Sequence, residues 1–269
     1  MSTLSCALII VAIILLTCMA VNAVNQQKEY ATTAVLGLGA AAVGALAVNN
    51  MNSVTSEGEP NIEAAQHRIR NWDLQHDSTR GELNLSGLEL EVLPELPNGL
   101  KILNCSNNNL KSLPNLPDSL TGLYCSNNKI QSLPDLPGSL TKLDCSNNYL
   151  KSLPNLPDSL TALYCNNNQL QSLPNLPDSL TNLDCNNNKI QSLPDLPGSL
   201  TGLYCSNNEI ICLPDLPEEL TYLVVSGNDL QYPPSNLLDG GLISEKRLNE
   251  LRKYMEENPE RPPECNLTS

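Results

Sequence analysis

Apolar residues recur along the chain with a period of 20 residues from Arg80 onward. The repeating unit is LxxLxCxxNxLxxLPxLPxx, and one copy begins at Leu120. Its LxC segment alternates inward and outward positions, which predicts a short β-strand. Its LPxLP segment is rich in proline, which fixes φ and lacks an N–H donor. We therefore expect each repeat to contain one strand and an extended, polyproline-like return limb without a helix.

The period and the pattern together predict the architecture of the chain. Short repeats of this kind stack into solenoids, in which each strand pairs with the strand of the next repeat. LxxLxLxxNxL is the leucine-rich repeat pattern, and cysteine here takes one of its inward positions. We predict a leucine-rich repeat solenoid with a curved parallel β-sheet and an extended, non-helical convex side. About eight repeats span residues 80–233, and the first and last copies depart from the consensus, as capping repeats do.

An asparagine follows the strand at the same position in seven consecutive repeats. Its side-chain amide can bond backbone groups in the turn that would otherwise be buried without partners. We therefore expect a structural asparagine ladder, formed by Asn108, Asn128, Asn148, Asn168, Asn188, Asn208 and Asn228.

Cysteine takes an inward strand position in six repeats. A free cysteine is a small apolar residue that buries readily, and stacked strands hold neighbouring Cβ atoms too far apart for good disulfide geometry. The sequence lacks the clustered CxxC spacing of zinc sites, and no histidine lies in the repeats to activate a thiol. Whether Cys212 and Cys265, which lie outside this column, form a pair is open. We predict no metal and a packed structural spine of Cys105, Cys125, Cys145, Cys165, Cys185 and Cys205.

Amphipathic segments flank the repeats on both sides. Residues 61–79 include NIEAAQHRIRNWDLQ, whose apolar residues follow a helical period and predict a helical cap. Residues 234–269 contain a second predicted helix, from about Ser244, its predicted N-cap, to Glu257. The candidate buried residues of the two caps are Ile62, Ala65, Ile69, Trp72 and Leu74, then Leu248, Leu251 and Met255.

The N-terminal part of the chain is apolar and lies apart from the repeats. Residues 1–23 read as a signal peptide ending at Ala23 or as a membrane anchor. Residues 24–60 form a linker that contains a second apolar segment, 32–48, a candidate transmembrane segment whose small residues recur four apart; a flexible Ala/Gly linker is the alternative. We expect membrane association through these segments, or export to the cell surface or medium. Six spine thiols suit a reducing compartment instead, so the two features disagree.

The repeat unit LPxLPxxLxxLxCxxNxL resembles that of the short, 20-residue LPX subclass of bacterial leucine-rich repeat proteins. That subclass occurs in type III secretion effectors, including those whose repeats precede a novel E3 ubiquitin ligase domain. The resemblance covers roughly residues 61–235 and implies a helical cap before the first repeat. The roughly forty residues after the repeats are too few for the ligase domain, and they show no match to its catalytic cysteine segment.

Charge and strand composition indicate the class of partner. The formal net charge is −14 and the isoelectric point is about 4.4, which argues against nucleic acid. The outward residue before the spine cysteine is Asn104 in the first case and then alternates between tyrosine and aspartate, within a 40-residue super-repeat. Tyrosine is enriched at binding hot spots, and aspartate would select a basic segment of a protein partner. The alternative is that duplication copied these residues without a binding role. The candidate partner-binding residues on the concave face are Tyr124, Asp144, Tyr164, Asp184, Tyr204 and Tyr222.

These observations predict a protein–protein interaction module rather than an enzyme, with no cofactor. One alternative is a secreted, host-directed effector related to the bacterial leucine-rich repeat ligases but without a catalytic domain of its own. Another is a truncated ligase-type protein. A third is a surface adhesion protein.

Overall fold

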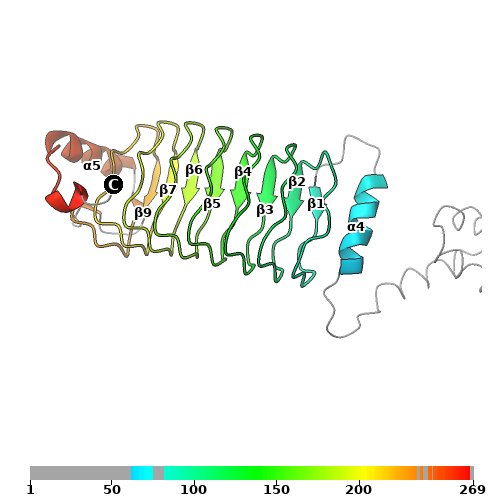
Figure 1. Ribbon diagram of the computed structural model, residues 1–269. Coiled ribbons are helices and arrows are strands. Elements are labelled where there is room, and N and C mark those ends of the chain that lie inside the picture. Colours follow the sequence, from blue (N-terminus) through cyan, green and yellow to red (C-terminus); the bar gives the residue numbers. More distant parts are fainter. Residues whose placement is uncertain (1–61, 75–81, 235–236, 239–241, 244, 267–269) are drawn as a thin grey trace, which may run out of the picture. The chain divides into compact units, whose positions relative to one another are not determined.

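The computed structural model describes residues 62–74, 82–234, 237–238, 242–243 and 245–266, all within one compact unit, Pro60–Ser269 (Figure 1). The predicted signal or anchor at 1–23, the linker at 24–60 and its apolar segment at 32–48 lie outside the described residues. Among the helices that are described, none combines the length and the apolar character needed to cross a membrane.

The repeats form a single sheet in which the strands follow each other in chain order. Each strand pairs in parallel with the next, and the register joins each residue to the one 20 positions later, for example Leu123 to Leu143. A last, short strand pairs antiparallel with β8. The predicted leucine-rich repeat solenoid is thus confirmed, and Figure 1 shows its strands side by side. The strands are β1 (Glu82–Asn84), β2 (Ile102–Asn104), β3 (Gly122–Tyr124), β4 (Lys142–Asp144), β5 (Ala162–Tyr164), β6 (Asn182–Asp184), β7 (Gly202–Tyr204), β8 (Tyr222–Val224) and β9 (Leu242–Ile243).

The core consists of columns of apolar side chains, one from each repeat. In the repeat that contains β3, Leu120, Leu123, Cys125 and Ile130 are all fully buried. The return limb carries no helix, and its leucines pack against the same core from the opposite side. Because every repeat buries its apolar residues only against its neighbours, the stability of the array depends on the contacts between repeats.

The turn after each strand requires a left-handed backbone. Asn107 and the five asparagines that stack on it have φ between 54° and 57°. The first and last turns place Gly87 and Gly227 at the same position, with φ of 67° and 71°. Asparagine and glycine are the residues that adopt this conformation most readily, which explains why only these two occur in the column.

Helix α4 (Ile62–Leu74) precedes the first repeat and packs on β1. Ala65 and Trp72 are buried, whereas Ile62 and Ile69 are partly buried against the core. Arg68 donates a hydrogen bond to the carbonyl of Asn84, at 2.9 Å, which ties the helix to the end of β1. The side chain of Leu74 lies outside the described residues.

Helix α5 (Glu245–Glu257) and the short 3₁₀ helix η2 (Pro263–Asn266) follow the last repeat. Leu248, Leu251 and Met255 are all buried, as the apolar stripe predicted. Ser244, the predicted N-cap, lies outside the described residues. The guanidinium of Arg252 donates hydrogen bonds to the carbonyls of Pro217 and Leu220, so the helix is anchored to the return limb that precedes β8.

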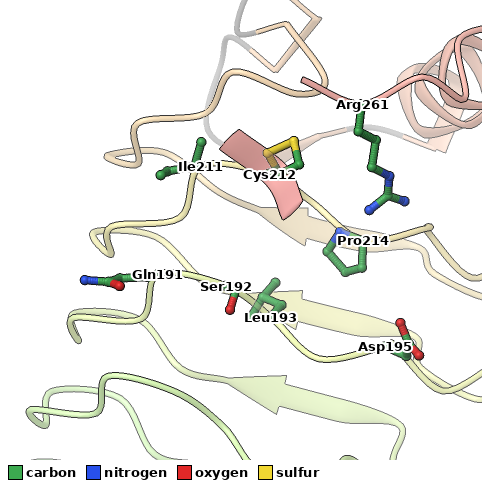
Figure 2. Close-up of a pocket in the computed structure, with 9 residues that line it drawn as sticks. Gln191, Ser192, Leu193, Asp195, Ile211, Cys212, Pro214 and Arg261 are labelled. Carbon is green, nitrogen blue, oxygen red and sulfur yellow. A yellow bond between two sulfur atoms is a disulfide. The ribbon is translucent and has the colours of Figure 1, made fainter. Parts of the chain in front are cut away.

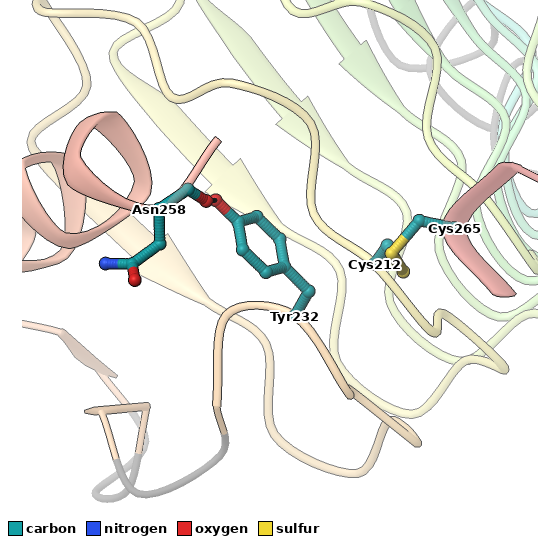
Figure 3. Close-up of a disulfide and its surroundings, with 4 residues drawn as sticks. All are labelled: Cys212, Tyr232, Asn258 and Cys265. Carbon is teal, nitrogen blue, oxygen red and sulfur yellow. Dashed lines mark hydrogen bonds between the residues drawn. A yellow bond between two sulfur atoms is a disulfide. The ribbon is translucent and has the colours of Figure 1, made fainter. Parts of the chain in front are cut away.

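A disulfide joins Cys212 to Cys265, with 5.5 Å between the Cα atoms (Figure 3). The bond fixes η2 to the return limb after β7. Nearby, the Tyr232 hydroxyl donates to the carbonyl of Asn258 at 2.7 Å, and the Arg261 guanidinium lies 5.6 Å from the centre of the Tyr232 ring. The pairing that the sequence left open is therefore present. Cys212 stands where the preceding repeats have serine, at Ser112, Ser132, Ser152, Ser172 and Ser192.

Candidate functional site

The sheet face opposite the core is formed by the first and third residues of each strand, because the middle leucine points inward. We call it the outward sheet face. On it, Tyr164 is 40% exposed and Tyr222 is 52% exposed, while Tyr124 and Tyr204 are half-buried. The strand register places the third residues in one row, so tyrosines and aspartates alternate along it. This row contains Asn104, Tyr124, Asp144, Tyr164, Asp184, Tyr204 and Val224.

Each tyrosine of this row shares its strand with a small residue, which makes room for the ring. A Cβ atom placed on Gly122 would lie 3.5 Å from the Tyr124 ring, and one on Gly202 would lie 3.4 Å from the Tyr204 ring. Tyr164 is preceded in the same way by Ala162, which is only 6% exposed. The rings of Tyr124 and Tyr204 thus lean back along their own strands over the first position. The sequence contained this signal, since the 40-residue super-repeat pairs each of these tyrosines with glycine or alanine.

The aspartates of the row have a local structural role that the sequence analysis did not identify. The carboxylates of Asp144 and Asp184 accept hydrogen bonds from the backbone N–H groups of Ser146 and Asn186, each at 3.1 Å. Asn104 makes the same bond to the N–H of Ser106 at 3.2 Å. This side-chain-to-backbone bond closes the turn after the strand.

The electrostatics of the two carboxylates are not equivalent. Burial raises the pKa of the Asp184 carboxyl, the hydrogen bond from the Asn186 backbone lowers it, and the negative charge of Asp144 raises it further. Asp144 shares its strand with the exposed Lys142, whereas Asp184 shares its strand with the neutral Asn182. The negative charge of Asp184 therefore has no cation at the first position of its own strand.

The seven predicted ladder asparagines lie in the turns behind the sheet. Each ladder amide donates to the carbonyl of its own cysteine-column residue and to the carbonyl of that residue in the preceding repeat, as Asn128 does with Cys125 and Cys105. Its oxygen accepts from a backbone N–H of the preceding repeat, here that of Leu110 at 3.0 Å. Asn108, Asn128, Asn148 and Asn208 are buried, and Asn168, Asn188 and Asn228 are half-buried. The side chains thus join each repeat to the one before it.

The six predicted spine cysteines are free thiols, and each is fully buried. Their column begins with Leu85 and ends with Val225, so cysteine here takes the place of an aliphatic residue. Burial raises the pKa of Cys105 and of Cys205 to about 12, and it raises the pKa values of the four cysteines between them well above the usual range. The thiolate, which is the reactive form, is therefore disfavoured throughout the column.

We expect the six spine cysteines to resist alkylation in the native protein at pH 8, because a thiol with a pKa near 12 is about one part in ten thousand ionised at that pH and is also shielded from the reagent. Labelling with iodoacetamide followed by peptide mass spectrometry would measure this residue by residue. The same protein in denaturant is the control and should label at all six positions. Rapid labelling of Cys145 in the native protein would contradict the buried spine.

A shallow cavity of about 100 Å³ lies beside the disulfide (Figure 2). Return-limb residues such as Gln191 and Asp195 line it together with Arg261 of the C-terminal cap. The Arg261 guanidinium already pairs with the carboxylate of Asp215 at 2.6 Å. None of the predicted partner-binding residues lines this cavity, which therefore reflects the junction of the cap with the repeats.

Comparison with known proteins identifies the family. The model for "Leucine Rich repeats (2 copies)" matches residues 118–158. YopM, a leucine-rich effector protein from Yersinia pestis, is 39% identical; the alignment covers 68% of this chain and 52% of YopM, with a TM-score of 0.61. A Shigella effector leucine-rich repeat domain is 30% identical over 81% of this chain and 93% of that domain, with a TM-score of 0.57. The chain belongs to the family of bacterial effector leucine-rich repeat proteins.

The similarity to these leucine-rich repeat proteins lies in the repeat region and does not extend over the whole length of each protein. The chain spans about half the length of YopM but nearly all of the Shigella repeat domain. No curated protein sequence matches it. Leucine-rich repeat solenoids are in general scaffolds for protein–protein interaction rather than catalysts, and this chain has their fold.

Proposed function

We propose that this protein binds a partner protein on the outward sheet face, which is the concave face of the predicted solenoid, and that it has no catalytic activity of its own. The observation that carries the proposal is the set of tyrosines on this face: Tyr124, Tyr164 and Tyr204 in the row, and Tyr222 at the first position of β8. Tyrosine offers a large, rigid contact area with a polar tip. It is favourable at interfaces because its side chain loses little conformational entropy on binding. Parallel strands hold these side chains on a rigid support.

The charge of this face supports a partner that presents a basic segment. Asp144 and Asp184 lie between the tyrosines, and the whole chain has a net charge of −14. Complementary charge speeds encounter and excludes acidic partners. The 20-residue period and the LPxLP limb further support membership of the short LPX subclass.

The disulfide supports an exported protein that acts in an oxidising compartment. Structural disulfides persist outside the cytosol, where thiols are not kept reduced. The Cys212–Cys265 bond agrees with the apolar N-terminal segments, which we propose direct export or attach the chain to a membrane as in a surface adhesion protein. The spine thiols do not oppose this location, because they are fully buried.

A host-directed effector is the second candidate, and the similarity to YopM and the Shigella effector domain supports it. Mass spectrometry of the N-terminal peptide from the native cell tests for a cleaved signal, since a start at Val24 would indicate cleavage and export. A start at Met1 would favour an uncleaved anchor or the effector.

Photo-crosslinking tests the binding face. We expect a photoreactive amino acid in place of Tyr164 to trap a partner in the native cell, because this position is exposed on the proposed face. Tyr149 is the matched control, since it is 50% exposed but lies outside the strands. Equal trapping at both positions, or trapping at Tyr149 alone, would contradict the assignment of this face.

A further inference from the structure

The spacing of the tyrosines indicates the conformation of the ligand. Tyr124, Tyr164 and Tyr204 lie on alternate strands, β3, β5 and β7. Neighbouring strands are about 4.8 Å apart, so these tyrosines repeat about every 9.6 Å along the sheet. The aspartates of β4 and β6 repeat with the same period, displaced by half of it. A ligand that runs across the strands would therefore meet the same side chain at regular intervals.

Only some backbone conformations match this interval. A polyproline II helix rises about 3.1 Å per residue with three residues per turn, and so presents equivalent side chains every ~9.3 Å. A β-strand presents them every ~6.7 Å, which misses the middle tyrosine. The heptad of an α-helix is about 10.5 Å long, and its error accumulates to almost 2 Å over two intervals. For polyproline II the accumulated error is about 0.6 Å.

The lean of the rings suits such a ligand. Because Tyr124 and Tyr204 extend back along their strands over Gly122 and Gly202, each ring lies crosswise to the direction in which the strands are stacked. Strands that carry a tyrosine therefore alternate with strands that carry an aspartate across this face. Proline-rich segments generally bind in grooves lined by aromatic side chains. Their polyproline II helix is already formed before binding, so little conformational entropy is lost.

We propose that the outward sheet face binds a proline-rich segment in the polyproline II conformation, with proline at every third residue over Tyr124, Tyr164 and Tyr204 and with arginine or lysine opposite Asp184. This inference rests on the proposed function, because it names the ligand of the same face. Asp184 is the anchor for the cation because its strand carries no basic residue, whereas Lys142 accompanies Asp144.

Two synthetic isomers test the period. They have the same composition of proline and arginine and differ only in order: PPRPPRPPRPPR keeps a three-residue period, whereas PPPPRRRRPPPP has no three prolines at positions i, i+3 and i+6. We expect the full-length protein to bind the periodic peptide about tenfold more tightly by isothermal titration calorimetry. Equal affinities would mean that charge alone attracts the peptides, and would overturn the proposal.

Variants of the protein locate the contact. Tyr164→Ala is expected to weaken binding of the periodic peptide about five- to tenfold, and Tyr164→Phe to retain it, since the ring forms the contact. Tyr149→Ala is the matched control and should bind as the wild type does. Asp184→Asn should weaken binding of PPRPPRPPRPPR but leave binding of PPQPPQPPQPPQ unaffected. Circular dichroism of each variant separates loss of binding from loss of the fold.

The outcomes distinguish this inference from the proposed function. Crosslinking at Tyr164 without any peptide binding would leave the binding face intact and reject the polyproline ligand. Undiminished peptide binding to Tyr164→Ala would reject the site itself. A dimer that sedimentation detects in the wild type and not in Tyr164→Ala would show that a second copy occupies the face, and would overturn the proposal as well.

Discussion

Replacing Asn148 with alanine is expected to lower the free energy of unfolding by about 2–4 kcal/mol, because a buried N–H left without its partner costs about 1–3 kcal/mol and each further lost hydrogen bond about 0.5–1.5 kcal/mol. Asn148 is 5% exposed. Its amide donates to the carbonyls of Cys125, Cys145 and Ser146, each at 3.1 Å, and its oxygen accepts from the N–H of Ile130 at 3.0 Å. Alanine would remove all four bonds. The three carbonyls each keep a second donor, whereas the buried N–H of Ile130 would lose its acceptor.

The loss should exceed that of an ordinary side-chain deletion because it acts on the interface between two repeats. In a solenoid each repeat contacts only its neighbours, so a defect in the middle uncouples the two halves. Urea unfolding followed by circular dichroism would measure the change. Asn155→Ala is the control, since this asparagine is exposed on the return limb of the same repeat, and it should change the stability by less than about 0.5 kcal/mol. Equal effects of the two substitutions would show that the ladder does not hold the repeats together.

The repeats were predictable because each position in the period has one physical requirement. Leucine fills the core, asparagine bonds the turn, and proline prevents a helix on the return limb. A residue such as Leu123 is therefore placed by the pattern alone, and the structure finds it paired with Leu143 as a register of 20 residues requires. The two cap helices were also predictable, since Trp72 and Met255 belong to apolar stripes at helical spacing.

The features that were missed depend on contacts between different positions rather than on one column. The lean of Tyr204 over Gly202 requires the two residues to be considered as a pair on one strand. The turn bond of Asp144 was not predicted, because the alternation of aspartate with tyrosine indicated a binding role. The disulfide pairing at the C-terminal cap could not be deduced from the sequence, since the path of the chain after β8 follows no period. Even so, Cys212 in a column of serines marked where the cap attaches.

Breaking the disulfide is expected to have the second large effect on stability. We expect Cys212→Ser to lower the free energy of unfolding by about 2–4 kcal/mol, because the bond closes a loop of 53 residues and restricts the unfolded chain. Serine is the residue of the five preceding repeats at this position, so the substitution introduces nothing foreign to the fold. The C-terminal cap would then be held by side-chain contacts alone, such as that of Arg252 with Pro217.

Reduction provides the matched control for this substitution. In urea unfolding, dithiothreitol should lower the stability of the wild type to that of Cys212→Ser. The stability of Cys212→Ser should be the same with and without dithiothreitol, and Cys265→Ser should behave identically. The double variant should be no less stable than either single variant, since both remove the same bond. A wild type whose stability is insensitive to dithiothreitol would contradict a stabilising bond, and would remove the main physical support for folding in an oxidising compartment. Sensitivity to the reductant would instead mean that the cap is fully stable only in a compartment where the disulfide can form.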